Sequence, residues 1–221
     1  MYPEICMDPE CAKENLMEHC NAMLFKDIFS LGGIRLGDKF EKLVQYLAYN
    51  VGSLISYDSV SREIGLNKNT VADYITLLEQ CFIVKVCPSY AKNLSNELKK
   101  SKKIYFCDNG IRNAVLLPQS NDEGKLLENN VFLHLNRNRQ PYEKITYFKE
   151  NCECDFVVQH DDLVTQLIQV TWTMADPATK EREINGLLEA AKVTGCANLT
   201  IVTFDEESTI HTVPAWKWML K

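Results

Sequence analysis

The stretch SYDSVSREIGLNKNTVADYITLLEQCFIVKVC, residues 56–87, decides the fold of the first half of the chain. Its apolar residues predict a short helix with Val60 and Ile64 inward, a turn at Gly65-Leu66-Asn67, and then a longer helix. Two helices joined by a short turn that contains glycine are typical of a helix-turn-helix. The longer helix is predicted to bury one face, made of Val71, Ile75, Leu78 and Phe82.

A β-ribbon is predicted directly behind this motif. The strand FIVKVC (82–87) follows the second helix, and a second strand, KKIYFCD (102–108), returns after a loop. This arrangement is the winged variant of the helix-turn-helix. Residues 85–103, which include the wing tip, carry six lysines against one glutamate. Such a local basic footprint favours contact with nucleic acid, and a solvated lysine-rich loop is the alternative.

The second helix of a DNA-reading motif enters the major groove with its N-terminal residues foremost. Asp73, one turn further on, would face the phosphates and oppose binding. Winged helices also serve as plain packing modules, so both interpretations stay open. The candidate DNA contacts are Lys68, Asn69 and Thr70 on the helix and Lys92, Lys99, Lys100, Lys102 and Lys103 in the ribbon.

Composition places the chain among ordinary soluble globular proteins, with 46% hydrophobic and 24% charged residues in 221. The sequence has no run of about 18 apolar residues and no signal peptide at MYPEICMDPECAKE, so we expect a cytoplasmic protein without a membrane partner. Nine scattered cysteines without a CxxC pair favour neither a zinc site nor a redox motif. The net charge of −6 hides a basic middle: residues 35–113 carry 12 basic and 8 acidic groups.

The second half of the sequence is predicted to form a mixed sheet flanked by helices. A helix is predicted over EGKLLENNVFLHLNRN (123–138) and another around 178–194, starting at Pro177. We expect a helical lead-in at 1–34, a winged helix-turn-helix domain at 35–113 and the α/β domain at 114–221. The strand candidates are 144–148, 154–159, 163–172, 198–204 and 208–213.

Acidic residues stand where chemistry would be expected in this α/β domain. Glu128 lies on the first helix, and Glu153 and Asp155 begin a central strand. Gln169 and Thr171 share one face of the next strand, because side chains alternate along a strand. Carboxylates placed in this way hold Mg²⁺ through oxygen ligands in metal-dependent nucleases, where a lysine helps to orient the attacking hydroxide.

On these residues the C-terminal half resembles the PD-(D/E)XK nuclease superfamily. Glu128 matches its helix glutamate, Asp155 its strand aspartate, and Gln169-Val170-Thr171 falls on its (D/E)-x-K. Nearly the whole chain also resembles the C-terminal region of a prokaryotic family of AAA-type ATPases, in which an ATPase module precedes a winged helix and a PD-(D/E)XK-like domain of unknown function. The matching stretches are YP (2–3), LFKDI (24–28), NKNTVADYITLLEQCFIV (67–84), KKIYFCDNGIRNAV (102–115), GKLLENNVF (124–132), CECDFVV (152–158) and IQV (168–170).

This chain departs from both patterns. The sequence has no Gly-Lys-Ser/Thr of a P-loop, so we expect a C-terminal fragment without ATPase activity, with ATP bound only in an N-terminal module outside it. Thr171 stands in place of the nuclease lysine, and Gln169 in place of a carboxylate. Both changes weaken a nuclease site, although Lys149 is a candidate substitute for the lysine.

The sequence therefore predicts the DNA-binding or regulatory portion of an AAA-type ATPase with a degenerate nuclease-like domain. Glu128, Asp155 and Gln169 are its vestigial catalytic residues, and no cofactor is expected. A metal-dependent DNA endonuclease, with Mg²⁺ held by Glu128, Glu153 and Asp155, is one alternative. An interaction module for a protein partner or for a second copy of the chain is the other, and double-stranded DNA is the partner of the first interpretation.

Overall fold

The computed structural model describes residues 18, 37–91, 93–116, 122–208 and 211–220. All but one residue of the helical lead-in predicted at 1–34 lie outside these residues, and so does the candidate contact Lys92. The chain divides into two compact units. The first unit holds the described residues up to Val86 and from Ile104 to 116, and the second holds those from Cys87 to Lys103 and from 122 onward. This division differs from the predicted one, because residues 87–103 group with the C-terminal half.

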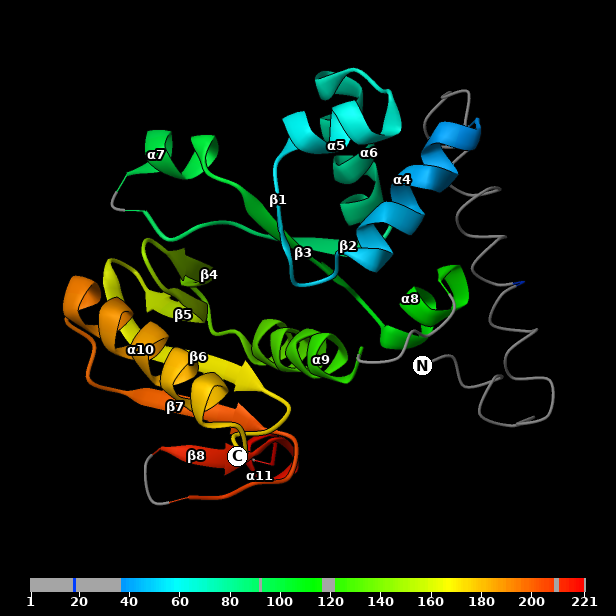
Figure 1. Cartoon of the computed structure of the whole chain (residues 1–221). Coiled ribbons are helices and arrows are strands. Elements are labelled where there is room, and N and C mark those ends of the chain that lie inside the picture. The colour runs from blue at the N-terminus through cyan, green and yellow to red at the C-terminus, as the bar shows by residue number, and fades with distance from the viewer. Residues whose placement is uncertain (1–17, 19–36, 92, 117–121, 209–210, 221) are drawn as a thin grey trace. The chain divides into compact units, whose positions relative to one another are not determined.

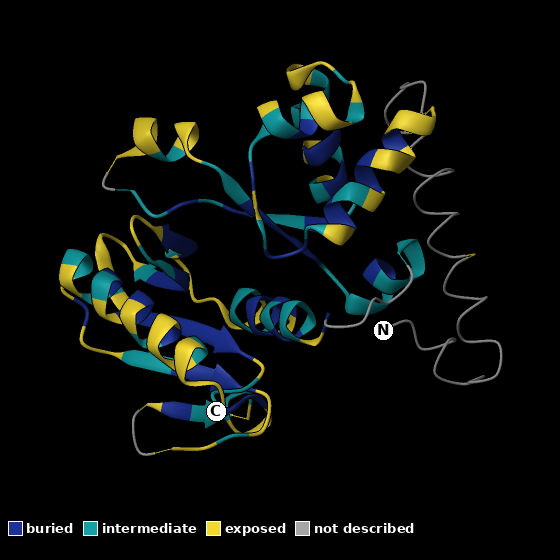
Figure 2. Ribbon diagram, viewed as in Figure 1, coloured by how far each residue is buried: buried dark blue, intermediate teal, exposed yellow. Residues whose placement is uncertain are grey.

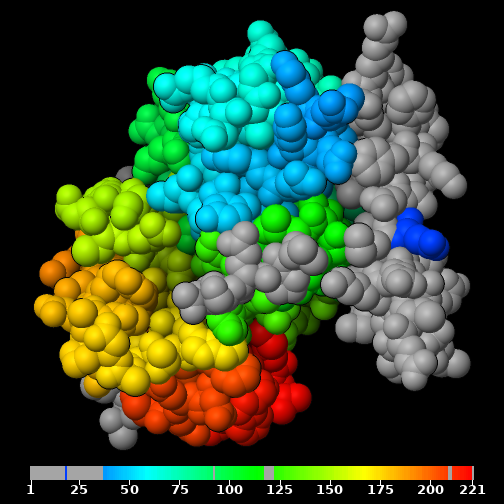
Figure 3. Space-filling model, turned by 45° about the vertical axis from the view of Figure 1, so that its right-hand side comes forward, coloured from blue at the N-terminus to red at the C-terminus, as the bar shows by residue number. Residues whose placement is uncertain are grey.

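The first unit is mainly helical (Figure 1). Within the described residues its short strands pair in the order β1-β3-β2. In the space-filling view, the blue to cyan residues of α4 to α6 form a continuous surface (Figure 3). The elements are α4 (Asp38–Tyr49), β1 (Leu54–Ile55), α5 (Tyr57–Ile64), α6 (Lys68–Gln80), β2 (Val84–Cys87), β3 (Lys102–Phe106) and α8 (Asn109–Val115), with the last residue of β2 and the first two of β3 counted in the second unit.

The core of the first unit forms where the apolar faces of α4 and α6 meet. Phe40 and Tyr74 pack edge to face with ring centroids 5.2 Å apart. One residue of the predicted buried face of α6 behaves differently. The helix ends at Gln80, and Phe82 is 72% exposed with a positive φ of 56°. Phe82 therefore belongs to the turn before β2, and the buried face consists of Val71, Tyr74, Ile75 and Leu78.

Helix α5 begins with a reciprocal cap. The hydroxyl of Ser56 accepts a hydrogen bond from the Ser59 backbone N–H at 3.0 Å, and the Ser59 hydroxyl accepts one from the Ser56 N–H at 3.2 Å. Such a box satisfies two amide donors that the first turn of a helix leaves unpaired. Gly65, in the left-handed conformation at φ 70°, ends the helix and starts the turn to α6.

We expect Ser56→Ala to lower the free energy of unfolding by about 1 kcal/mol, because the N-terminal amides of α5 lose their cap. Urea denaturation followed by circular dichroism measures the change. Ser61→Ala is the matched control, since Ser61 donates only to the carbonyl oxygen of Asp58 within the same helix. Equal losses in the two variants would contradict a special role for the cap.

The second unit is built on a mixed sheet. Within the described residues, the strand order is β4-β5-β6-β7-β8. The pairs β4–β5 and β5–β6 are antiparallel, whereas β6–β7 and β7–β8 are parallel. The elements are α7 (Leu94–Lys99), α9 (Glu123–Asn138), β4 (Glu143–Lys149), β5 (Glu153–His160), β6 (Leu163–Thr171), α10 (Pro177–Thr194), β7 (Leu199–Thr203), β8 (Thr212–Pro214) and α11 (Ala215–Trp218).

Helices α9 and α10 pack on this sheet through neighbouring residues of β5. The ring of Phe132 on α9 lies 6.0 Å from that of Phe156. On α10, Leu187 and Ala190 join a core cluster that includes Val157. Because successive strand residues point to opposite faces, the two helices lie on opposite faces of the sheet. Figure 2 shows the dark blue of buried residues along the strands and yellow on the outer side of α10.

The prediction of an α/β fold is confirmed. The loop predicted between the ribbon strands contains the short helix α7, with Asn93 as its N-cap. The cysteines among the described residues are free thiols. No helix in the described ranges combines the length and the hydrophobicity needed to cross a membrane.

Candidate functional site

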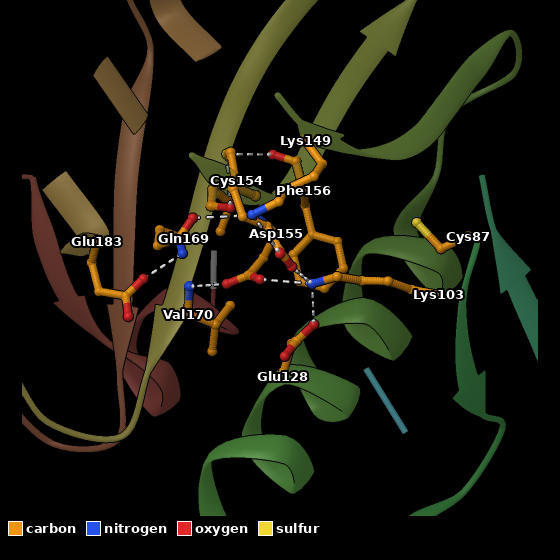
Figure 4. Close-up of polar contacts among 12 residues, drawn as sticks. Cys87, Lys103, Glu128, Lys149, Cys154, Asp155, Phe156, Gln169, Val170 and Glu183 are labelled. Atoms are coloured by element: carbon orange, nitrogen blue, oxygen red, sulfur yellow. Dashed lines mark hydrogen bonds and ion pairs between the residues drawn. The ribbon is translucent and has the colours of Figure 1, made fainter. Parts of the chain in front are cut away.

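The acidic residues predicted from the sequence meet around the ammonium of Lys103. Lys103 lies on β3, Glu128 on α9, and Glu153 and Asp155 at the start of β5, all in the second unit. The Nζ atom is 3.0 Å from Glu128 Oε1, 2.8 Å from Glu153 Oε1 and 2.9 Å from Asp155 Oδ1. Figure 4 shows Lys103 between Asp155 and Glu128. We call Lys103, Glu128, Glu153 and Asp155 the acidic cluster.

Lys103, one of the predicted DNA contacts, is buried in this structure. Its side chain is only 2% exposed, and its ammonium is held by the carboxylates of the acidic cluster. A lysine is rarely buried to this extent unless it is paired, because removing a charge from water is costly. Lys149, the candidate substitute for the nuclease lysine, lies at the border of the cluster, 3.7 Å from Glu153 and 40% exposed.

Asp155 is fixed through both its carboxylate and its backbone. Its Oδ2 atom accepts a hydrogen bond from the Val170 backbone N–H at 2.9 Å, while Oδ1 faces Lys103. Its own backbone N–H donates to Gln169 Oε1 at 3.1 Å. Strands β5 and β6 therefore hold the carboxylate in one orientation, with the charge-assisted bonds that are the strongest of their kind.

Gln169 has a definite structural task at the position of the missing carboxylate. While its carbonyl oxygen accepts from Asp155, its amide nitrogen donates to Glu183 Oε2. A carboxylate has no hydrogen to donate when ionised, so an acid at 169 would face Glu183 without a hydrogen bond. The amide therefore connects the backbone of Asp155 with a carboxylate on α10, as Figure 4 shows.

Sequence reasoning missed Glu183. This residue of α10 is 4% exposed, and its Oε1 atom accepts hydrogen bonds from the Arg182 guanidinium, including one from Nε at 3.0 Å. The hydrogen bond and the charge of Glu183 raise the pKa of Arg182. In the sequence, Glu183 stands in the run KEREI, which is typical of a solvated helix face. A usable signal was Gly186 one turn later, since glycine inside a helix often marks close packing.

Thr171, at the position of the nuclease lysine, does not join the acidic cluster through its hydroxyl. That hydroxyl donates to the carbonyl oxygen of Thr173 at 3.1 Å. The buried Cys87 thiol lies near the cluster (Figure 4). Burial raises the pKa of Cys87, and the charges of Glu128 and Asp155 add to this rise against the opposing effect of Lys103. The thiol therefore stays neutral at physiological pH.

A cavity of about 600 Å³ opens beside the acidic cluster in the second unit. Carboxylates, cationic groups and amides all line it. Among the described residues, no group of three or more histidine, cysteine, aspartate or glutamate side chains is arranged to hold a metal ion. The lining residues are Glu128, Lys149, Asn151, Cys152, Glu153, Asp155, Gln169, Val170, Arg182, Glu183 and Asn185.

The remaining candidate DNA contacts among the described residues lie on α6 in the first unit and on or next to α7 and β3 in the second. Lys68 and Asn69 are exposed at the start of α6, and Thr70 beside them is half-buried. Lys68 pairs with Asp58 at 2.6 Å. The other candidates belong to the second unit: Lys99 and Lys100 are exposed at the end of α7 and just after it, and Lys102 is partly buried at the start of β3.

Comparisons with known proteins give distant relatives. The chain is 26% identical, over 241 aligned positions that cover 99% of it, to the uncharacterized protein MJ1544 of Methanocaldococcus jannaschii. It is 25% identical to an uncharacterized protein of Haemophilus influenzae over 73% of its length. The chain spans about half the length of these relatives, 53% of the first and 41% of the second. No solved structure matches it.

A family match covers more than half of the chain. Residues 1–122, out of 221, match the family described as a domain of unknown function (DUF8612). The matched part contains α5, α6 and Lys103, and it ends one residue before α9. The protein therefore belongs to the DUF8612 family.

Proposed function

We propose that this chain is the DNA-binding or regulatory portion of a larger AAA-type ATPase, and that its nuclease-like unit does not cleave DNA. The observation that carries the DNA-binding part is the exposed start of α6. Asn67 and Lys68 are exposed there, directly after the glycine turn that follows α5. The order of α4, β1, α5, α6, β2 and β3 supports a winged helix, and the ATPase part rests on the resemblance of the sequence.

The ion pair of Lys68 with Asp58 is compatible with this role. Both side chains are more than half exposed, at 54% and 62%. An exposed ion pair contributes at most about 1 kcal/mol, so a phosphate can replace Asp58 as the partner of Lys68. Asn69 adds an exposed amide, a group that pairs with adenine in the major groove.

The acidic cluster supports the absence of cleavage. A divalent metal would need the oxygen atoms of Glu128, Glu153 and Asp155, which the Lys103 ammonium contacts at 2.8–3.0 Å. The ammonium thus competes with a metal for its ligands. Thr171 supplies no ammonium for a transition state, and the amide of Gln169 is occupied by Asp155 and Glu183.

A metal-dependent endonuclease is the second candidate, favoured by one observation. Glu128 and Asp155 lie on the same side of the sheet, both within 3.0 Å of one ammonium. If Lys103 took the role of the missing lysine, the charged groups of a nuclease would be present, although no described group is arranged to hold the metal.

Fluorescence anisotropy with labelled duplex DNA tests the DNA-binding proposal. We expect binding that weakens steeply between 50 and 200 mM salt, as counterion release requires. Lys68→Ala should weaken it and reduce the slope of log affinity against log salt by about one. Asp73→Asn should strengthen it, because Asp73 is exposed on the next turn of α6 and would repel phosphates.

Lys42→Ala is the matched control, since it removes one exposed charge from α4 of the same unit. An equal loss in Lys42→Ala and Lys68→Ala would contradict a role for α6, and no binding at the lower salt concentration would contradict DNA binding. Incubation with Mg²⁺ or Mn²⁺ should leave single-stranded, duplex and branched DNA intact. Metal-dependent products that vanish in Asp155→Ala and Glu128→Ala would establish the endonuclease instead.

A further inference from the structure

Helix α7 presents an apolar face that contributes nothing to the core of the second unit. Leu94 and Leu98 are each 65% exposed, and no residue of α7 is buried. Residues four apart lie on the same side of a helix, so the two leucines form one apolar strip. Exposed leucines that occur singly are ordinary, whereas two on one side of an otherwise polar segment offer a binding surface.

Polar contacts hold α7 in place without using these leucines. Glu97 on α7 pairs with Lys144 of β4 at 2.5 Å, and its side chain is 14% exposed. Just after the helix, the carbonyl oxygen of Ser101 accepts a hydrogen bond from the buried Tyr147 hydroxyl at 2.5 Å. These contacts attach the helix to the second unit, and both leucines remain 65% exposed.

The charge around the leucines restricts what can cover them. Lys99 and Lys100 are exposed beside Leu98, and the glutamate of this segment, Glu97, already pairs with Lys144. An acidic partner complements such a surface. The phosphate backbone of DNA would pair with the lysines but would leave the leucines without an apolar partner. The combination of leucines and lysines therefore favours a protein.

We propose that Leu94, Leu98, Lys99 and Lys100 form a docking surface, the α7 surface, for an acidic amphipathic segment of a partner protein. Apolar residues of that segment would cover the leucines, and its carboxylates would pair with the lysines. This is a recognition mode in which a few apolar anchors give affinity and charges give orientation. The proposal is independent of DNA binding at α6, because it uses a different element.

Binding of a labelled amphipathic peptide, with leucines at i and i+4 steps and glutamates beside them, tests the α7 surface in the full chain. Leu94→Ser/Leu98→Ser should weaken peptide binding at least about tenfold, since two apolar anchors are lost. Lys99→Glu/Lys100→Glu should weaken it most at low salt. Both variants should keep the melting temperature of the parent, because α7 contains no buried residue.

Leu163→Ser is the matched control, a leucine of β6 that is 74% exposed. It should bind the peptide as the parent does. No peptide binding by the parent, or equal binding by parent and leucine variants, would overturn the proposal. If Leu94→Ser/Leu98→Ser lost DNA binding, the proposal would be overturned in favour of DNA as the ligand of this surface. If the parent self-associated in a concentration-dependent way and this variant did not, the surface would bind a second copy of the chain instead.

Discussion

Lys103→Met is expected to lower the free energy of unfolding by about 3–5 kcal/mol, the usual effect of breaking a buried ion pair. The substitution removes the ammonium and leaves the carboxylates of Glu128, Glu153 and Asp155 facing one another. Lys149, which reaches Glu153 at 3.7 Å at the border of the cluster, compensates only part of their mutual repulsion. Urea denaturation of parent and variant measures the difference.

A divalent cation should partly restore this variant. Carboxylate oxygens are the ligands that Mg²⁺ and Mn²⁺ prefer, and removing Lys103 frees them. Added Mn²⁺ should therefore raise the melting temperature of Lys103→Met, because a ligand that binds only the folded state stabilises it. The parent should show no such rise while its ammonium occupies the cluster.

Lys149→Met provides the control for both measurements. Lys149 also pairs with Glu153 but is 40% exposed, so its loss should cost at most about 1 kcal/mol. If Lys103→Met and Lys149→Met were destabilised to a similar extent, the burial of Lys103 in the acidic cluster would make no special contribution to stability. A rise in the melting temperature of the parent with Mn²⁺ would instead show that metal and ammonium do not compete.

Gly186→Ala is expected to destabilise the second unit by about 3 kcal/mol, toward the upper end of the effects of overpacking. A Cβ atom at this position of α10 would lie 2.1 Å from the backbone carbonyl oxygen of Glu153. Backbone cannot rotate away as a flexible side chain can, so α10 must move off β5. That movement would also separate Glu183 from Gln169, which α10 and β6 hold together. Thermal denaturation measures the loss.

Gly124→Ala on α9 is the control: it is the same substitution at a helix position where the opposite effect on stability is expected. A Cβ atom there would meet nothing within 4 Å. Alanine in a helix is favoured over glycine by about 0.5–1 kcal/mol, so this variant should be slightly more stable than the parent. If Gly186→Ala were also stabilising, the close approach of α10 to β5 would not be rigid.

Local signals in the sequence predicted the helices and strands well, because their causes are local. The apolar spacing of α5, the glycine after it and the apolar spacing of α6 each act within a few residues. The same kind of signal for α7 was overlooked. Asn93 caps the helix, and Leu94 and Leu98 follow at helical spacing, but the surrounding lysines favoured a loop.

The partners within the acidic cluster are not local, and the sequence predicted them only in part. The pairing of Glu128 with Asp155 followed from the resemblance, whereas Lys103 lies 52 positions from Asp155 along the chain. In the sequence Lys103 stands among other lysines, which favours a solvated surface. The periodicity of the sequence does not distinguish a buried lysine from its exposed neighbours. The burial of Lys103 depends on residues of α9 and β5, which lie much further along the chain.

The division of the chain between its units also bears on how this protein can be dissected. The chain leaves the first unit after Val86, returns after Lys103, and leaves again between 116 and 122. A fragment expressed from residue 114 onward would contain Glu128 and Asp155 but not Lys103. In such a fragment these carboxylates would lack the ammonium that balances their charge. A cation affinity measured on it would therefore result from the removal of Lys103 and would not describe the intact protein.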